Sequence, residues 1–181
     1  MPDIFTPVVT EAGFNAALAA ETGGFSVDVT HVAVGSSGYA VATNQVGRAT
    51  QLGLVAEEQR VAIQDARDIG NGQTDISFVI DGPGSYYIRE IGFFLADGTL
   101  FAVASDPVTA LMWKSDVSRA AIALELVFEA VNSSAIQIVA AGPDLTLLMT
   151  REIATVSAIA MRNALENLRL ADRIRTITGE Y

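Results

Sequence analysis

The chain has 181 residues, which is enough for one domain and an appended segment. Its net charge of −10 is unevenly placed, because residues 1–150 carry −11 and residues 151–181 carry +1. Binding to a nucleic-acid backbone requires basic patches, so this acidic balance argues against a nucleic-acid partner. The chain has no cysteine, which excludes disulfides and thiolate metal sites.

Hydrophobic residues make up 50% of the chain, and the mean hydropathy of +0.36 is high for a soluble protein. The longest apolar runs, such as 91–96 and 120–124, fall far short of the roughly 18 residues that a membrane span requires. The N-terminus lacks the basic region of a signal peptide, so we expect no membrane insertion. Since only 18% of the residues are charged, we expect apolar surface to be buried between subunits.

The first predicted element is a short helix over 11–20. Thr10 is suited to cap its start, and Gly23-Gly24 is suited to end it. Alternating apolar residues then predict a strand over 25–34. The polar stretch that follows, to about residue 50, lacks periodicity and predicts a long loop, which in a compact domain is often a contact surface.

Extended segments are predicted for most of the region from 60 to 140. The strongest signal is a hairpin whose turn is Asp97-Gly98, because an Asp-Gly pair between two β-prone runs favours a tight turn with positive φ. The predicted strands span residues 60–64, 75–80, 85–95, 99–104, 120–130 and 135–140.

Residues 144–181 are predicted to form a long amphipathic helix, since no glycine or proline occurs between 145 and 178. Apolar residues recur there at about 100° intervals, and two asparagines interrupt the stripe, as in a helical seam whose register is fixed by buried Asn. Packing of this helix on its own subunit is the alternative to a coiled coil between copies. The candidate contacts between copies are Ile153, Val156, Ala160, Asn163, Asn167, Leu168 and Ile174.

These patterns together predict an α+β fold. Residues 1–143 form a mainly antiparallel β body with a short N-terminal helix. Residues 144–181 form the long C-terminal amphipathic helix, which serves self-association or partner docking.

Three stretches resemble the phage tail-collar fibre protein family. Residues 87–94, Tyr-Ile-Arg-Glu-Ile-Gly-Phe-Phe, followed by Asp97-Gly98-Thr99-Leu100, are similar to that family's W-I-R-E-I-G-L-F-x-x-x-G-x-L pattern, with Tyr87 where Trp is frequent. Residues 5–13 resemble its T-x-x-G helix start. Residues 30–35 resemble its T-H-M-A-V-G-D strand, with Ser36 where Asp is frequent. The likeness covers roughly residues 5–140 in the right order.

The resemblance implies a structural virion protein, made in the bacterial host cytoplasm and located in the tail. Such domains occupy the particle-proximal end of trimeric tail fibres. The implied partners are therefore further copies of the chain in a homotrimer, proteins of the tail tip, baseplate or collar, and a downstream fibre protein. The implied family motif residues are Tyr87, Arg89, Glu90, Gly92 and Gly98. The chain ends at Tyr181 without a repetitive shaft, which favours a short fibre or an adaptor that contributes to host attachment.

Within the motif, Arg89 and Glu90 are neighbours on a predicted strand and must point to opposite faces. One of them is therefore expected to face inward or into an interface, and the alternative is an ordinary solvent-side charge beside a core residue.

Site chemistry is sparse. With one histidine, His31, and no cysteine, we expect no metal site, no cofactor and no enzymatic activity. The acidic residues are scattered in predicted loops and do not form the facing carboxylate pair of a glycosidase. The alternative function is a glycan- or receptor-binding module at the host cell surface, in which Tyr39 and Trp113 stack on sugar.

Overall fold

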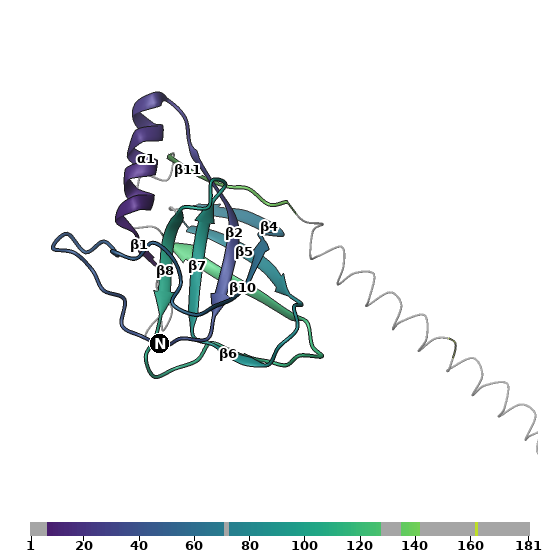
Figure 1. The fold of residues 1–181 in the computed structure, drawn as a ribbon. Helices are drawn as coiled ribbons and strands as arrows, with labels where there is room; N and C mark the ends of the chain where they lie inside the picture. The colour runs from purple at the N-terminus through teal and green to yellow at the C-terminus, as the bar shows by residue number, and fades with distance from the viewer. Residues whose placement is uncertain (1–6, 71–72, 128–134, 142–161, 163–181) are drawn as a thin grey trace, which may run out of the picture. The chain divides into compact units, whose positions relative to one another are not determined.

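The computed structural model describes residues 7–70, 73–127, 135–141 and 162 (Figure 1). The chain divides into two compact units, Met1–Gly142 and Pro143–Tyr181. All the elements below belong to the first unit.

The first unit is built around a six-stranded main sheet. Its strand order is β1-β8-β7-β2-β11, and β3 pairs with the same edge of β2 further along that strand. All its pairings are antiparallel except that of β11 with β2. The strands are β1 (Val8–Val9), β2 (Val27–Gly35), β3 (Glu57–Ala62), β7 (Glu90–Leu95), β8 (Leu100–Ser105) and β11 (Ile136–Ile138).

Two smaller sheets complete the unit. A three-stranded antiparallel sheet has the order β10-β5-β4, and it crosses behind the main sheet in Figure 1. A two-stranded ribbon pairs β6 with β9. The strands are β4 (Asp65–Gly70), β5 (Gln73–Ile80), β6 (Tyr86–Ile88), β9 (Met112–Lys114) and β10 (Ala120–Val127).

The main sheet is covered on both faces, so β7 is buried along its whole length. The face toward the three-stranded sheet forms the principal core, in which Phe93 of β7 packs with Phe78 of β5. The opposite face packs against the loop of residues 36–56, where Phe94 and Leu100 join a smaller cluster with the loop residue Ala49. Because neighbouring strand residues alternate between faces, consecutive apolar residues serve both cores.

The helix α1 (Glu11–Gly23) begins and ends as the sequence predicts, although it is three residues longer. Thr10 is its N-cap and accepts a hydrogen bond from the amide of Gly13 at 2.9 Å. Gly24 closes it in the left-handed conformation with φ of 74°, which glycine adopts without steric cost. No helix of the described residues is long and apolar enough to cross a membrane.

The predicted α+β class is wrong. The described residues form mostly antiparallel β-sheet with one short helix, and the long C-terminal helix that the class required is not among the described elements. The prediction gave that helix too much weight and missed β1, β4 and β9. Of these, β9 has only three residues and β1 has two, which is too short for alternation to be recognised. Apart from Arg162, residues 142–181 lie outside the described part.

Two predicted segments differ from the structure in their boundaries. The predicted strand over 85–95 is interrupted at Arg89, where the chain leaves the β6–β9 ribbon and enters the main sheet as β7. The predicted loop after β2 is longer than expected and runs to residue 56. The Asp97-Gly98 hairpin is confirmed: it joins β7 to β8, Gly98 has φ of 87°, and the Asp97 carboxylate accepts the Thr99 amide at 2.8 Å.

Candidate functional site

The candidate site is the anchor that holds the loop of residues 36–56 against the main sheet. At its centre is the carboxylate of Glu90, which is fully buried at the start of β7. One carboxylate oxygen accepts the Ala56 amide at 2.7 Å. The other accepts the Val55 amide at 2.9 Å and the Tyr39 hydroxyl at 2.8 Å. A buried carboxylate needs such donors to replace the water that it loses, so Glu90 fixes both ends of the loop.

The surroundings of Tyr39 change the pKa of its hydroxyl group. Burial raises the pKa of the Tyr39 hydroxyl well above its usual range, and its hydrogen bond to the Glu90 carboxylate raises it further. The hydroxyl therefore stays protonated and acts as a donor at any physiological pH. This half-buried ring belongs to the anchor, so its hydroxyl is not available to a ligand.

Two glycines make room for the anchor. A β-carbon on Gly35, the last residue of β2, would lie 2.5 Å from the Ala56 carbonyl oxygen and 2.6 Å from Cγ of Glu90. A β-carbon on Gly92 would lie 2.9 Å from the Leu54 side chain. Both distances are below van der Waals contact. The clash at Gly35 is with a backbone oxygen, so that position requires glycine for the loop to approach the sheet, whereas at Gly92 the end of the Leu54 side chain would have to shift.

The start of α1 is fixed to the same sheet in a similar way. The Thr10 hydroxyl donates to the Leu100 carbonyl while accepting the Gly13 amide, so one side chain both caps the helix and binds β8. A β-carbon on Gly13 would lie 2.7 Å from Cα of Phe101. The loop joins this contact, because the Ala49 amide donates to Val9 and the Glu11 amide donates to Ala49.

The three sequence motifs therefore all hold chain segments against the main sheet. The helix-start motif supplies Thr10 and Gly13, the β2 motif supplies Gly35, and the β7 motif supplies Glu90 and Gly92. Gly98 lies apart from them in the β7–β8 turn. Each residue positions backbone, and none of them presents a reactive group to solvent.

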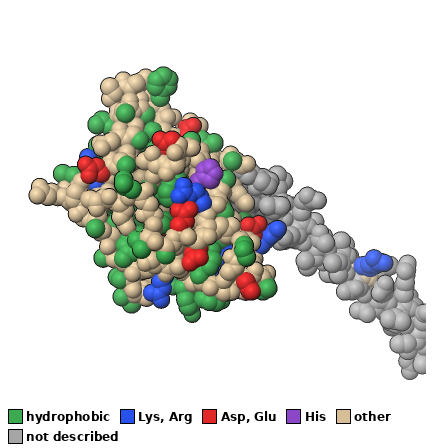
Figure 2. Space-filling model, in the orientation of Figure 1, with side chains coloured by type: hydrophobic (Ala, Val, Ile, Leu, Met, Phe, Trp, Pro, Cys, Tyr) green, Lys and Arg blue, Asp and Glu red, His purple; other side chains and the backbone are tan. Residues whose placement is uncertain are grey.

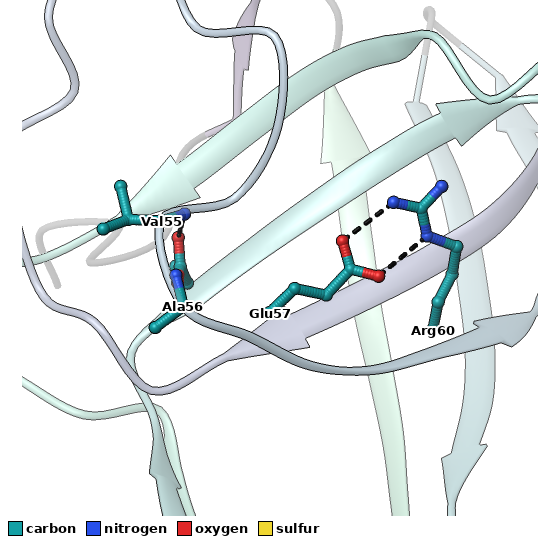
Figure 3. A network of polar contacts seen from close by, with 5 residues as sticks. Val55, Ala56, Glu57 and Arg60 are labelled. Atoms are coloured by element: carbon teal, nitrogen blue, oxygen red, sulfur yellow. Dashed lines mark hydrogen bonds and ion pairs between the residues drawn. The ribbon is translucent and has the colours of Figure 1, made fainter.

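An exposed ion pair lies close to the anchor. Figure 3 shows the amides of Val55 and Ala56 next to the pair formed by Glu57 and Arg60. The Arg60 guanidinium donates to the Glu57 carboxylate at 2.8 and 2.9 Å, and it also lies over the Phe94 ring at 3.6 Å from the centroid. Exposed pairs of this kind contribute little to stability, so Arg60 acts mainly as a cover for Phe94.

Arg89 does not share the role of its neighbour. It is half-buried, its amide donates to the Gly35 carbonyl at 2.9 Å, and its guanidinium lies 5.9 Å from the Tyr87 ring centroid. Glu90 is thus the member of the pair that faces inward.

The aromatic residues proposed for glycan stacking have different partners. Trp113 pairs with Tyr87 across the β6–β9 ribbon, with ring centroids 4.6 Å apart and planes inclined by 58°. Both rings are about half exposed. Tyr39 belongs to the Glu90 anchor instead.

One buried polar residue was not predicted. Lys114 is fully buried at the end of β9, where its ammonium group donates to the carbonyls of Gly82 and Ser115. These hydrogen bonds connect the β6–β9 ribbon to the turn at Gly82, which precedes β6. A single lysine after Met112 and Trp113 carries no sequence signal for burial.

The last residues to consider are His31, possible metal ligands and the predicted contacts between copies. His31 is half-buried on β2, and its Nδ1 lies 2.7 Å from the Thr30 hydroxyl. In the part of the chain that the structure describes, no group of three or more His, Cys, Asp or Glu side chains could hold a metal ion. On the face that Figure 2 shows, acidic, basic and hydrophobic side chains are interspersed. The seven candidate trimer contacts between Ile153 and Ile174 lie outside the described residues.

The comparison with family profiles matches residues 1–156 to the phage tail-collar fibre protein N-terminal family. That match spans α1, the anchored loop and every described strand. Neither the curated proteins nor the solved structures contain a match. The family consists of structural proteins of the virion tail. Because the match covers most of the chain, the protein belongs to the phage tail-collar fibre protein family and carries its N-terminal domain.

Proposed function

We propose that this protein is a non-enzymatic attachment module of a phage tail fibre. It assembles as a homotrimer and docks to the tail tip, baseplate or collar, either as a short fibre or as an adaptor for a downstream fibre protein. Through that position it contributes to host attachment.

The observation that carries the proposal is the use of the motif residues. Thr10, Gly13, Gly35 and Glu90 all serve to hold a helix and a long loop against the main sheet. A site built for catalysis presents reactive side chains in a cleft. Here the motif residues fix the shape of a surface instead, which suits a protein that is bound by other proteins.

Self-association is assigned to residues 144–181, through Ile153, Val156, Ala160, Asn163, Asn167, Leu168 and Ile174. The support comes from composition: residues 144–181 carry no net charge, whereas residues 1–143 carry −10. Copies therefore meet there with less electrostatic repulsion than elsewhere.

Native mass spectrometry of the full chain, with tail assembly in the presence and absence of the protein, tests the proposal. We expect a trimer and a requirement for the protein in fibre attachment. A stable monomer that still supports attachment would contradict the homotrimer, and attachment without the protein would contradict the docking role.

The exposed Tyr87–Trp113 pair favours a second candidate, a glycan-binding module. Two adjacent half-exposed rings offer apolar faces on which a sugar can stack. Trp113 is the only tryptophan, so its fluorescence reports directly on this site. A saturable fluorescence change with host polysaccharide that is lost in Tyr87→Ala would support glycan binding, and an unchanged spectrum would argue against it.

A further inference from the structure

The anchored loop carries three exposed aliphatic side chains. Val46, Leu52 and Val55 are 70%, 82% and 64% exposed, whereas the loop residues that face the sheet, such as Ala49, are buried. We call Val46, Leu52 and Val55 the loop surface. The loop projects from the body on the side of α1, drawn in blue in Figure 1.

The loop that carries these side chains is held at several points. The Asn44 side chain accepts the amides of Val46 and Arg48 at 3.1 and 3.0 Å, which closes the turn that presents Val46. The Arg48 guanidinium lies over the Phe14 ring of α1, 3.3 Å from its centroid. At the other end, Glu90 holds the Val55 and Ala56 amides. A surface fixed in this way loses little conformational entropy when a partner binds.

The loop also differs in charge from the rest of the molecule. Residues 36–56 contain no Asp or Glu and one basic residue, Arg48, in a chain whose net charge is −10. The projecting end of the loop, at the left of Figure 2, correspondingly shows no acidic side chain. Exposed Glu11, Glu57 and Glu58 border the loop, but the loop itself adds no carboxylate to a contact between two copies of an acidic protein.

We propose that the loop surface is a contact between copies of this chain, packing on the neighbouring body within the trimer. This inference rests on the proposed homotrimer and adds the surface of the body through which copies touch. In a closed ring each copy offers one surface and receives a different one, so three loop contacts form per trimer. Because the loop itself has no Asp or Glu, a contact through it adds less repulsion than a contact through the acidic strands.

The absence of native cysteine makes a site-specific cross-linking test simple. A Leu52→Cys variant is labelled with a benzophenone maleimide and irradiated, and the products are separated under denaturing conditions. The control is Val117→Cys, labelled in the same way, because Val117 is 90% exposed in the turn between β9 and β10. Circular dichroism confirms that both variants fold.

We expect covalent dimers and trimers from position 52 and at least about tenfold less product from position 117. Leu52→Ser should raise the concentration at which the trimer dissociates by about tenfold, since burying a leucine side chain is worth roughly that factor or more. Val117→Ser should leave it unchanged.

Three outcomes would overturn the inference, and they separate it from the proposed function. A trimer with no cross-link at position 52, or with equal cross-linking at both positions, removes the loop contact and leaves the homotrimer. A cross-link from position 52 to a different tail protein in assembled particles assigns the loop surface to docking instead. A monomer by native mass overturns both the loop contact and the homotrimer.

Discussion

The two faces of the main sheet are covered in different ways. One face packs against a second sheet through large apolar side chains such as Phe78 and Phe93, and its stability comes from apolar area removed from water. The other face is covered by a loop, which is held by a small apolar cluster and by the hydrogen bonds of one buried carboxylate. The first face therefore determines whether the body folds, and the second determines how one surface of the folded body is shaped.

The largest expected effect is in the principal core. Phe78→Ala should lower the free energy of unfolding by about 3–5 kcal/mol, because it removes a fully buried ring and leaves a cavity. Urea denaturation measures the change. Phe25→Ala is the control, since Phe25 is exposed, and it should change stability by less than about 0.5 kcal/mol. Equal effects of the two substitutions would remove the distinction between core and surface.

Glu90→Gln should cost about 2–4 kcal/mol and should act mainly on the loop. Each carboxylate oxygen accepts a backbone amide, so the amide group of glutamine must place a donor against a donor. Hydrogen exchange should increase at residues 39–56 while β5 and β10 remain protected. Glu57→Gln, at the exposed ion pair, is the matched control and should have little effect on exchange. Faster exchange throughout the body would show that the two faces are not separable.

Gly35→Ala should cost about 1–3 kcal/mol, because the added methyl group would overlap the Ala56 carbonyl and the Glu90 side chain. The matched control is Gly53→Ala in the same loop, where a β-carbon would meet no atom within 4 Å. Thermal denaturation of both variants checks the prediction. A neutral effect at Gly35 would mean that the loop moves away from the sheet without loss.

Tyr39→Phe should have the smallest effect at neutral pH, about 1 kcal/mol for one hydrogen bond to the anchor. The raised pKa of Tyr39 adds a pH dependence. The unfolded side chain ionises near pH 10, so Tyr39 contributes stability that is complete below about pH 10 and is lost as pH rises above it. The variant should therefore lose less stability than the native protein between pH 10 and pH 12. Tyr87→Phe, whose ring is exposed, should follow the native curve.

The sequence predicted those parts of the fold that have a local cause. The cap at Thr10, the left-handed end of the helix at Gly24 and the Asp97-Gly98 hairpin each follow from a few neighbouring residues. The break at Arg89 was not predictable in this way, because the alternation of buried residues continues across it while the pairing partner changes from β9 to β8 and β2. The residues next to a strand in the sequence do not indicate which sheet the strand joins.

The site was predictable in part. The motif pointed to Arg89 and Glu90 as a pair with one inward member, but only the fold identifies Glu90, since its partners lie 34, 35 and 51 residues away in the chain. The loop could be recognised as a long contact segment. Its anchoring depends on tertiary contacts, which periodicity does not report.

The interruption at Arg89 has a mechanical consequence. The exposed Tyr87 of the β6–β9 ribbon and the buried Glu90 of the loop anchor are only three residues apart in the chain. A displacement of the ribbon is therefore expected to move the carboxylate that holds the loop, because only Ile88 and Arg89 separate the exposed Tyr87 from Glu90.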